Sequence, residues 1–446
     1  MKINPVALFF LGVAAICLVL SCGNRSSGQS SNETSIQEEV DSEDSQDDQP
    51  PVFNATSLKQ NTVSPAILYL DCSKSMAGYI EATNSSVFNS VIAGLLYRND
   101  SSTAHLFDLK EQVGIPRDSF IELVNNKKIN WSSESNLGKM INAMAENYIS
   151  GRADISYLIT DGIMSGTDAQ IRADREYNKT HYGYSQEEIE LSLKKCGNDV
   201  AVLVVQYISG FTTNSSKQFY YYCYDNSHVA LKEAARPFYI VALGKLDSIK
   251  KLKADIADNP RLSSFKNILL LGDEMPFPVD FKPAYNKGAS LKGEELVDGK
   301  KKPIYAVDKG VKSSDLVFFN VNLSSLQEYM INEDYLKENG ALFLKSVSGS
   351  EYEMSQTNYT QSLTNSVLSI GIESEKLRGA TLAYRIKYSL PTWISSSSSQ
   401  DDKNILKELS PKTFNFRYFV DALAIVNKPH LDSNGYINQT GDIRFK

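Results

Sequence analysis

The chain has 446 residues, of which 42% are hydrophobic and 22% charged, and its formal net charge is −7. This length exceeds one typical domain, and the apolar content is sufficient for more than one hydrophobic core. The chain lacks the excess of basic residues that nucleic-acid-binding proteins carry, so we expect no nucleic-acid partner.

The first 21 residues resemble a bacterial lipoprotein signal peptide. Lys2 precedes an apolar stretch from Val6 to Leu20, and its 15 residues fall short of the ~20 that a membrane-spanning helix needs. A small residue then precedes Cys22, which implies cleavage at this point and lipidation of Cys22. Acyl chains such as palmitate on Cys22 would anchor the mature protein to a membrane. The alternative is an ordinary secretory signal with an incidental cysteine.

Residues 22–60 have the composition of a disordered acidic tether. The part from 23 to 50 is rich in Ser, Asn, Gln, Asp and Glu and has no aromatic residue, so it cannot bury enough apolar surface to fold. Its eight acids and one arginine give a charge of −7, equal to that of the whole chain, so the folded part is close to neutral. Gly23, in place of an aspartate, gives no inner-membrane retention cue. We therefore expect a cell-envelope protein, in the outer membrane where the cell has two.

A short apolar run, residues 66–70, ends at Asp71. Such a run predicts a buried parallel strand whose C-terminal end lies at the sheet edge where open α/β sheets hold ligands. Asp71, Ser73 and Ser75 occupy alternate positions, so their oxygens can face one point. Ligands that are all oxygen suit a hard cation such as Mg²⁺, Mn²⁺ or Ca²⁺.

Two later segments carry matching features. A second apolar run, residues 155–159, ends in Thr160, Asp161 and Gly162, which predicts a second strand with a carboxylate at its end. Ser135 precedes a stretch with helical spacing of apolar residues. The apolar positions of that stretch are Leu137, Met140, Ile141, Met144 and Tyr148. A hydroxyl at the start of this helix can complete a site that three loops build.

These three motifs, in this order, resemble the von Willebrand factor type A (vWA) domain and its metal-ion-dependent adhesion site (MIDAS). Asp71, Ser73 and Ser75 match the family's DxSxS motif, and Asp161 matches its TDG motif. Ser135 stands where the family usually has threonine, which keeps the hydroxyl and loses the methyl group. The resemblance covers roughly residues 62–273. It implies a central, mostly parallel sheet with helices on both faces and cation-dependent binding of another protein, without catalysis.

The alternation of predicted strands and helices independently favours a doubly wound α/β fold for residues 61–275. Further buried strands are predicted at 200–205, 238–243 and 268–271, and a helix follows the first loop at Val87, Val91 and Leu95. Ser185 and Glu188 have the spacing of a capping box at the start of another helix. The tyrosine-rich segment 219–224 predicts an added hairpin, used either for recognition or for cross-strand packing.

Residues 276–446 are predicted to form a separate β-rich domain of no recognised family. Apolar residues alternate in four stretches, which favours an antiparallel sandwich. These stretches are 317–323, 368–372, 382–390 and 414–420. Proline residues between 276 and 283 mark the expected boundary.

The cysteines leave two possibilities open. We expect Cys72 to be buried in the metal loop, whereas Cys196 and Cys223 could form a disulfide or remain free thiols in an extracytoplasmic compartment.

An enzymatic function is not expected. The four histidines form no HExxH pair, and the chain has no phosphate-binding or dinucleotide-binding glycine pattern. A haloacid-dehalogenase-like, Mg²⁺-dependent phosphohydrolase is the main enzyme alternative, but that family needs a second Asp where this chain has Ser73. A hydroxyl cannot serve as the required general acid/base.

The sequence therefore predicts an envelope lipoprotein that binds a protein ligand through a carboxylate of that ligand at a cation site. Its ligands would be Asp71, Ser73, Ser75, Ser135 and Asp161. A structural lipoprotein whose metal ion only braces the loops is the alternative.

Overall fold

The computed structural model describes most of the chain from residue 65 onward. The described ranges are 65–83, 85–98, 102–107, 114–213, 216, 220–272, 280–285, 287–297, 299–347, 349–402, 412–427, 431–437 and 442–446. The predicted signal peptide, the lipidated Cys22 and the tether lie outside these ranges, as do Pro276 and Pro278. Within them, no helix has both the length and the apolar character needed to cross a bilayer.

A seven-stranded sheet with the strand order β3-β2-β1-β4-β8-β5-β9 forms the centre of the α/β part. Its strands are β1 (Ala66–Asp71), β2 (Thr103–Phe107), β3 (Ile115–Pro116), β4 (Ile155–Thr160), β5 (Val200–Phe211), β8 (Ala234–Lys245) and β9 (Asn267–Leu271). All five strands that the sequence predicts in this part are present. β1 lies between β2 and β4 and is parallel to both.

The rest of this sheet is antiparallel, so the expected mostly parallel sheet is in fact mixed. β8 pairs antiparallel with both β4 and β5, and β9 pairs antiparallel with β5. β5 and β8 pair with each other along their whole lengths, with β6 and β7 between them in the sequence. A continuous apolar run indicates only that both faces of a strand are buried, and the central strands β4, β5 and β8 meet that condition in either orientation.

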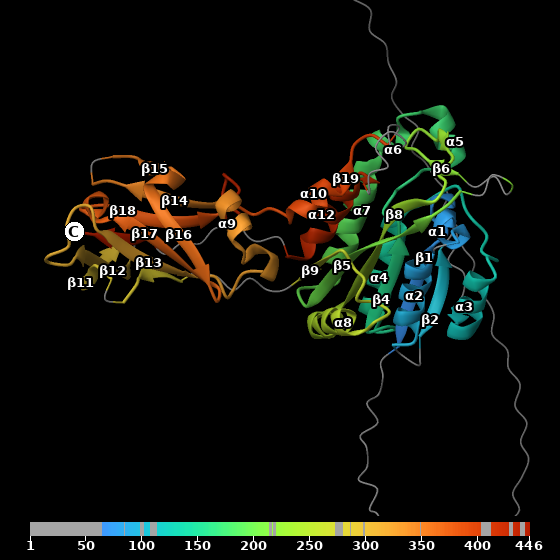
Figure 1. Ribbon diagram of the computed structural model, residues 1–446, viewed down its shortest axis with the longest axis horizontal. Coiled ribbons are helices and arrows are strands. Elements are labelled where there is room, and N and C mark those ends of the chain that lie inside the picture. Colours follow the sequence, from blue (N-terminus) through green and yellow to red (C-terminus); the bar gives the residue numbers. More distant parts are fainter. Residues whose placement is uncertain are drawn as a thin grey trace, which may run out of the picture. The chain divides into compact units, whose positions relative to one another are not determined.

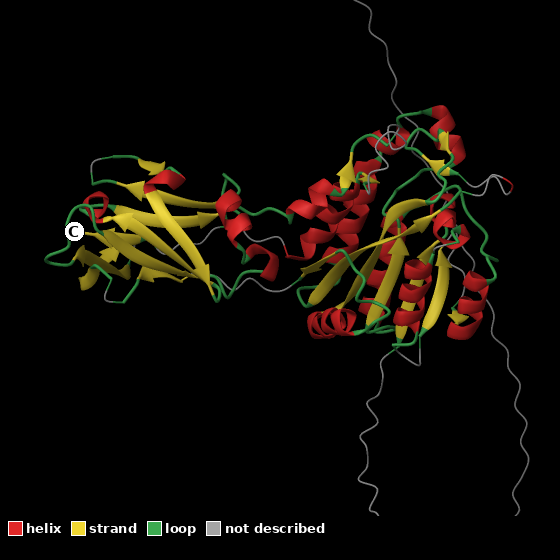
Figure 2. Cartoon of the chain, viewed as in Figure 1, coloured by secondary structure: helices red, strands yellow, loops and turns green. Residues whose placement is uncertain are grey.

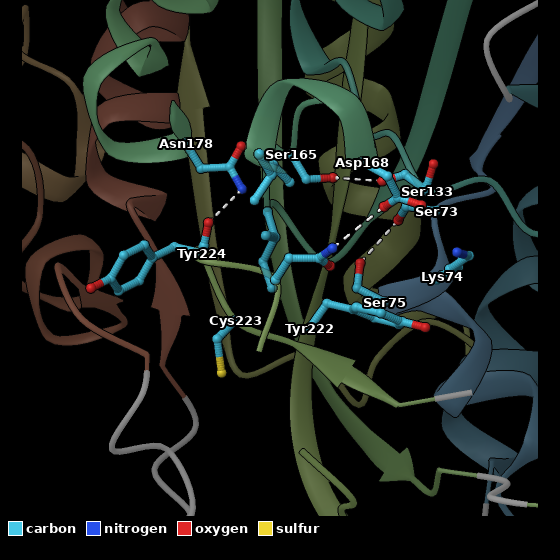
Figure 3. Close-up of a pocket in the computed structure, with 13 residues that line it drawn as sticks. Ser73, Lys74, Ser75, Ser133, Ser165, Asp168, Asn178, Tyr222, Cys223 and Tyr224 are labelled. Atoms are coloured by element: carbon cyan, nitrogen blue, oxygen red, sulfur yellow. Dashed lines mark hydrogen bonds between the residues drawn. The ribbon is translucent and has the colours of Figure 1, made fainter. Parts of the chain in front are cut away.

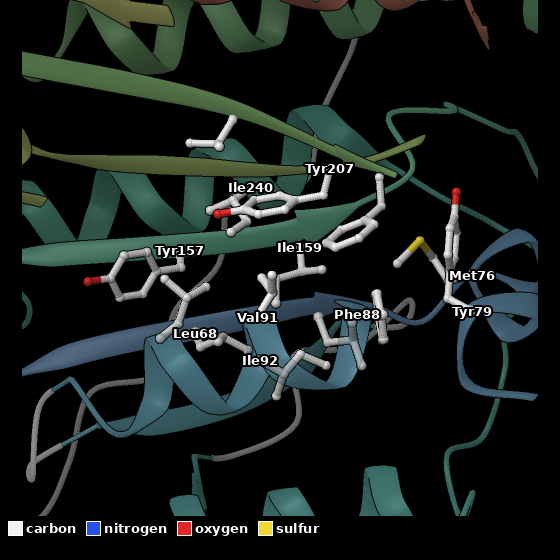
Figure 4. Close-up of a cluster of buried hydrophobic side chains, with 14 of the residues drawn as sticks. Leu68, Met76, Tyr79, Phe88, Val91, Ile92, Tyr157, Ile159, Tyr207 and Ile240 are labelled. Atoms are coloured by element: carbon white, nitrogen blue, oxygen red, sulfur yellow. The ribbon is translucent and has the colours of Figure 1, made fainter. Parts of the chain in front are cut away.

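Helices cover both faces of the sheet (Figure 1). The first face carries α1 (Ala77–Glu81), α2 (Ser86–Leu96), α3 (Arg117–Asn125) and α8 (Leu246–Asp258), and the second carries α4 (Leu137–Ser150) and α7 (Tyr182–Lys194). Figure 4 shows Phe88, Val91 and Ile92 of α2 facing the apolar side chains of the strands. Burial of each such side chain contributes about 1.5–3 kcal/mol to folding. Ser185 lies inside α7, so the predicted capping box is wrong.

A C-terminal segment also packs on the second face of the sheet. It contains α10 (Thr392–Ser396), β19 (Ser398–Ser399), β20 (Thr413–Phe414), α12 (Phe416–Leu423) and the 3-10 helix η6 (Ala424–Asn427). Ile394, Phe416, Phe419, Val420 and Leu423 are buried with the residues of α4 and α7. The predicted strand over 414–420 is therefore wrong beyond Phe414. Asn415, with φ of 54°, ends the short strand, and the apolar residues that follow form one face of a helix.

The β-rich part consists of a four-stranded sheet, β10-β13-β17-β16, and a six-stranded sheet, β11-β12-β21-β18-β14-β15 (Figure 2). The first contains β10 (Asp280–Pro283), β13 (Leu316–Asn322), β16 (Tyr359–Thr364) and β17 (Val367–Glu373). The second contains β11 (Ala289–Val297), β12 (Lys300–Val307), β14 (Gly340–Lys345), β15 (Glu351–Glu353), β18 (Thr381–Ile386) and β21 (Ile443–Phe445). Residues of both sheets share one hydrophobic core, as in a sandwich. The helix α9 (Glu333–Asn339) also contributes to that core.

The strands predicted at 317–323, 368–372 and 382–390 are found as β13, β17 and β18. The expected domain boundary at 276 describes the chain only in part, because the segment 392–427 contributes to the core of the α/β part.

Candidate metal site

The first and third sequence motifs meet because β1 and β4 are parallel neighbours. Their C-terminal ends lie at one edge of the sheet, which places Asp71 and Asp161 close together. Gly162 has φ of 73°, a value that favours glycine, and the chain turns there directly after Asp161. A side chain at Gly162 would also meet the rings of Phe416 and Tyr239, so the glycine of this motif serves the packing as well as the turn.

Backbone hydrogen bonds bring the second motif to the same edge. Ser135 N–H donates to the carbonyl of Ser165 at 3.1 Å, and Ser165 N–H donates back to the carbonyl of Ser135 at 3.0 Å. The helix α4 then begins at Leu137, where the side chain of Asn136 accepts a hydrogen bond from Lys139 N–H at 3.0 Å and caps the helix. Ser135 is thus fixed between a short bridge and the start of a long helix.

Asp71 is the centre of the hydrogen bonds at this site. Its Oδ1 accepts from Ser73 N–H at 2.9 Å, and its Oδ2 accepts from the hydroxyls of Ser135 at 2.9 Å and Thr160 at 2.8 Å. The hydroxyl oxygens of Ser73 and Ser75 lie 3.0 Å apart. Thr160 belongs to the third motif but is not among the predicted ligands. Its position next to Asp161 in the sequence is the signal that could have identified it.

Asp161 completes the set of predicted ligands. Its Oδ1 accepts from Ile163 N–H at 3.0 Å, and its carboxylate is hydrogen-bonded to the side chain of Ser75. All five predicted ligands therefore lie in one connected hydrogen-bond cluster, which Asp161 joins through Ser75.

Burial makes the two carboxylates costly to ionise together. Burial raises the pKa of Asp71 above its ordinary value, although hydrogen bonds from Thr160 and Ser73 oppose the rise. Burial and then the neighbouring charge of Asp71 raise the pKa of Asp161 to about 7. Two adjacent buried carboxylates with several hydroxyls are a chemistry that a divalent cation would stabilise.

The predicted ligands suit a hard cation because they are all oxygen atoms, from hydroxyls as well as from carboxylates. Among the described residues, no group of three or more His, Cys, Asp or Glu side chains is placed to hold a metal ion. Asp71 and Asp161 would therefore supply the charge, and Ser73, Ser75 and Ser135 the neutral oxygens. Two carboxylates formally balance a divalent ion, so attraction of a further anionic oxygen would depend on an open coordination position and on the nearby charge of Arg236.

Arg236 is a charged residue near this site that sequence reasoning missed. It lies on β8, is 3% exposed, and its guanidinium carbon is 4.7 Å from the ring centre of Tyr221. The charge of Arg236 lowers the pKa of Asp161, against the larger effects of burial and Asp71. No sequence pattern could have identified it, because β8 reaches the site only through its pairing with β4.

A small cavity of about 20 Å³ adjoins Ser73 and Ser75. This volume has room for a water-sized ligand. The cavity is bordered by the loop after Asp161 and by the hairpin of β6 (Tyr221–Tyr222) and β7 (His228–Val229), through β6 and the turn that follows it. Figure 3 shows Ser75 lying between Ser73 and the ring of Tyr222. The ammonium group of Lys74 lies 5.6 Å from the centre of that ring.

A hairpin is therefore present at the tyrosine-rich segment, but it is a separate two-stranded sheet of β6 and β7 and not an addition to the edge of the central sheet. Tyr221 is buried, whereas Tyr220 and Tyr222 are half-buried. The described cysteines, Cys72, Cys196 and Cys223, are all buried free thiols, so Cys196 and Cys223 do not form a disulfide.

Comparison of the chain with protein-family models, with curated proteins and with solved structures finds no match in any of the three.

Proposed function

We propose that this chain is an envelope-anchored lipoprotein that binds a protein partner through a divalent-cation-dependent, vWA-like site. The observation that carries the proposal is the hydrogen bond from Ser135 to Asp71, at 2.9 Å, between residues that lie 64 positions apart. It supports the idea that the three motifs form one site rather than three coincidental matches. The resemblance to the vWA family supplies the expected mode of action.

The residues of the site support cation binding in a definite way. Asp71, Ser73, Ser75, Ser135 and Asp161 would hold Mg²⁺, Mn²⁺ or Ca²⁺, and Thr160 would orient Asp71 through its hydrogen bond. The bound cation would supply a positive charge that attracts an anionic oxygen. An Asp or Glu carboxylate of a partner protein is the ligand of that chemistry.

Burial of the site favours a second candidate, in which the cation only braces the loops. Asp71 is fully buried, Ser73 and Asp161 are each 2% exposed, and Ser75 is 7% exposed. A partner's carboxylate has no direct route to these oxygens in this conformation. The two candidates differ in whether loss of the cation removes the partner.

Calorimetric titration with Mn²⁺ tests the common part of both candidates. Wild type should bind one Mn²⁺, and Asp71→Ala should not, because it removes the carboxylate that joins the three loops. Ser133→Ala is the matched control, because Ser133 lines the cavity beside the site and is outside the predicted ligand set. Equal binding by wild type and Asp71→Ala, or no binding by wild type, would contradict the proposal.

A pull-down from envelope extract then separates the two candidates. Protein binding at the site predicts a partner that is retained with Mg²⁺ and released by a chelator. The bracing role predicts that the same proteins are retained in both conditions.

A further inference from the structure

The small hairpin over the cation site, residues 221–229, is named here the lid. Tyr222, Cys223, Tyr224 and Asn226 of the lid line the cavity beside Ser73 and Ser75. Its two strands have two residues each and pair only with each other. A hairpin of this size is not stable alone, so contacts with its surroundings must hold it in place.

Tyr224 is held at both of its backbone groups. Its N–H donates to Oδ1 of Asp402 at 3.0 Å, and its carbonyl accepts from Nδ2 of Asn178 at 2.8 Å (Figure 3). Oδ1 of Asn178 accepts from Gly166 N–H at 2.8 Å. Asn178, in α6 (Tyr177–Thr180), thus ties the lid to the loop that follows Asp161.

Asp402 ties the lid to the C-terminal segment. Besides Tyr224, its carboxylate accepts from the hydroxyl of Tyr221 at 3.1 Å, and its backbone carbonyl accepts from the thiol of Cys223 at 3.6 Å. Asp402 is 2% exposed. Asp402 therefore accepts three hydrogen bonds from the lid, two at its carboxylate and one at its backbone carbonyl.

Aromatic contacts add to this attachment from the same segment. The ring of Tyr224 stacks on Phe414, with ring centres 5.3 Å apart and planes at 20°, and Lys179 lies 3.9 Å from the centre of the Tyr224 ring. Asp402 and Phe414 of the C-terminal segment thus both contact Tyr224 of the lid.

From these contacts, and resting on the proposed cation-dependent binding, we propose that Asp402 is a latch that keeps the lid closed over the cation site. A protein ligand then reaches the cation only when the latch is released. The reason is steric: with the lid in place the predicted ligands are at most 7% exposed, and the lid residues Tyr222, Cys223 and Tyr224 line the cavity beside Ser73 and Ser75. The lid pairs with no strand of the central sheet, so its opening breaks no strand pairing there, although Tyr221, Cys223 and Val229 must then leave the hydrophobic core that they share with that sheet.

Hydrogen exchange of the lid tests the latch without any metal. The full chain is compared with Asp402→Ala, Asp402→Asn and the control Asp401→Ala, which removes an exposed carboxylate from the adjacent position. Exchange is followed by mass spectrometry in the peptide covering 220–230. Asp402→Ala should raise the exchange rate of several lid amides at least tenfold, and not that of Tyr224 alone. Asp402→Asn, which keeps an acceptor for Tyr224 but loses the charge, should give a smaller increase.

Peptides from β1 and β4 serve as the internal reference for global unfolding. Their exchange should remain at the wild-type rate in all variants. Lid exchange in both Asp402 variants equal to that in Asp401→Ala would overturn the latch. An increase that is the same in the lid, β1 and β4 would overturn it too, because it would show general destabilisation.

Release of Mn²⁺ into excess chelator connects the latch to the cation site. Release should be at least tenfold faster from Asp402→Ala than from Asp401→Ala. If both variants bind Mn²⁺ and release it at the same rate, the lid does not control access to the site. Absence of Mn²⁺ binding in wild type and in Asp402→Ala would instead refute the proposed function, while lid exchange would still decide whether Asp402 holds the lid.

Discussion

The ring of Phe416 stacks on the ring of Tyr239, with centres 3.9 Å apart and planes at 16°. Tyr239 belongs to β8 in the central sheet, whereas Phe416 begins α12 in the C-terminal segment. The contact makes a late part of the chain a component of the α/β core, next to Gly162 and the cation site.

Phe416→Ala should therefore destabilise the α/β part by about 3–5 kcal/mol, the usual cost of truncating a fully buried aromatic side chain. Urea unfolding combined with hydrogen exchange measures this effect by region. Exchange should accelerate in peptides from β5 and β8 and remain unchanged in peptides from β13 and β17. Arg417→Ala is the control, because this side chain is exposed and lies 3.6 Å from Asp421 on the same helix. It should change stability by less than about 1 kcal/mol.

Ser73→Asp should separate cation binding from partner binding. The new carboxylate would add negative charge next to the cation, so Mn²⁺ affinity should be kept or raised. It would also occupy the position that a partner's carboxylate needs and would repel that carboxylate, so retention of a captured partner should fall. Ser73→Ala is the comparison and should weaken both, because it removes a ligand. If Ser73→Asp keeps the cation and also the partner, the bracing role is the better description.

Asp402 should make stability depend on pH in a direction set by its burial. Burial raises its pKa to about 6, while hydrogen bonds from Tyr224 and Tyr221 and the charge of Arg236 oppose the rise. A carboxyl whose pKa is higher in the folded protein binds its proton more tightly there. Its contribution to stability is therefore complete below the unfolded value of about 4 and is lost as pH rises through about 6.

The difference in unfolding free energy between wild type and Asp402→Asn isolates this effect. It should fall by up to about 3 kcal/mol between pH 4 and pH 7, since each unit of pKa shift corresponds to about 1.4 kcal/mol. Charged and titratable neighbours of Asp402, namely Arg236, Tyr221 and Cys223, are common to both proteins. A difference that is constant with pH would show that Asp402 keeps its ordinary pKa.

Cys22→Ala should release the protein from membranes. The prediction depends on the apolar segment that precedes Cys22, a part of the chain outside the described residues. Cell fractionation followed by carbonate washing compares the variant with wild type, and Cys17→Ala, within the same segment, is the control. A Cys22→Ala protein that resists extraction as wild type does would place the anchor elsewhere.

Much of the α/β part could be predicted from short-range patterns. The strands β1 and β4 follow from continuous apolar runs, and α4 follows from its helical spacing. Asp71, Ser73, Ser75 and Asp161 lie at or just after the ends of β1 and β4, and Ser135 lies just before α4. Because parallel neighbouring strands end at one edge, these positions were enough to predict that the ligands meet.

Other features depend on contacts that no local pattern contains. Alternation at 414–420 suggested a strand, but Phe416 and Val420 join Phe419 and Leu423 on the buried face of α12, because a helix there can pack on α7 and β8, and Tyr418 is exposed. The orientation of β8 and β9, the position of Arg236 and the closure of the site by the lid are set by pairing and packing at long range.

The sequence by itself thus determined which residues are predicted to bind a cation, because carboxylates and hydroxyls at strand ends are a local property. Only the tertiary structure decided how accessible this predicted site is. Accessibility depends on Tyr221, Tyr224 and Asp402, and the hydrogen bond between the last two joins residues 178 positions apart. Such a contact exists only once the C-terminal segment has packed against the sheet and removed both partners from water.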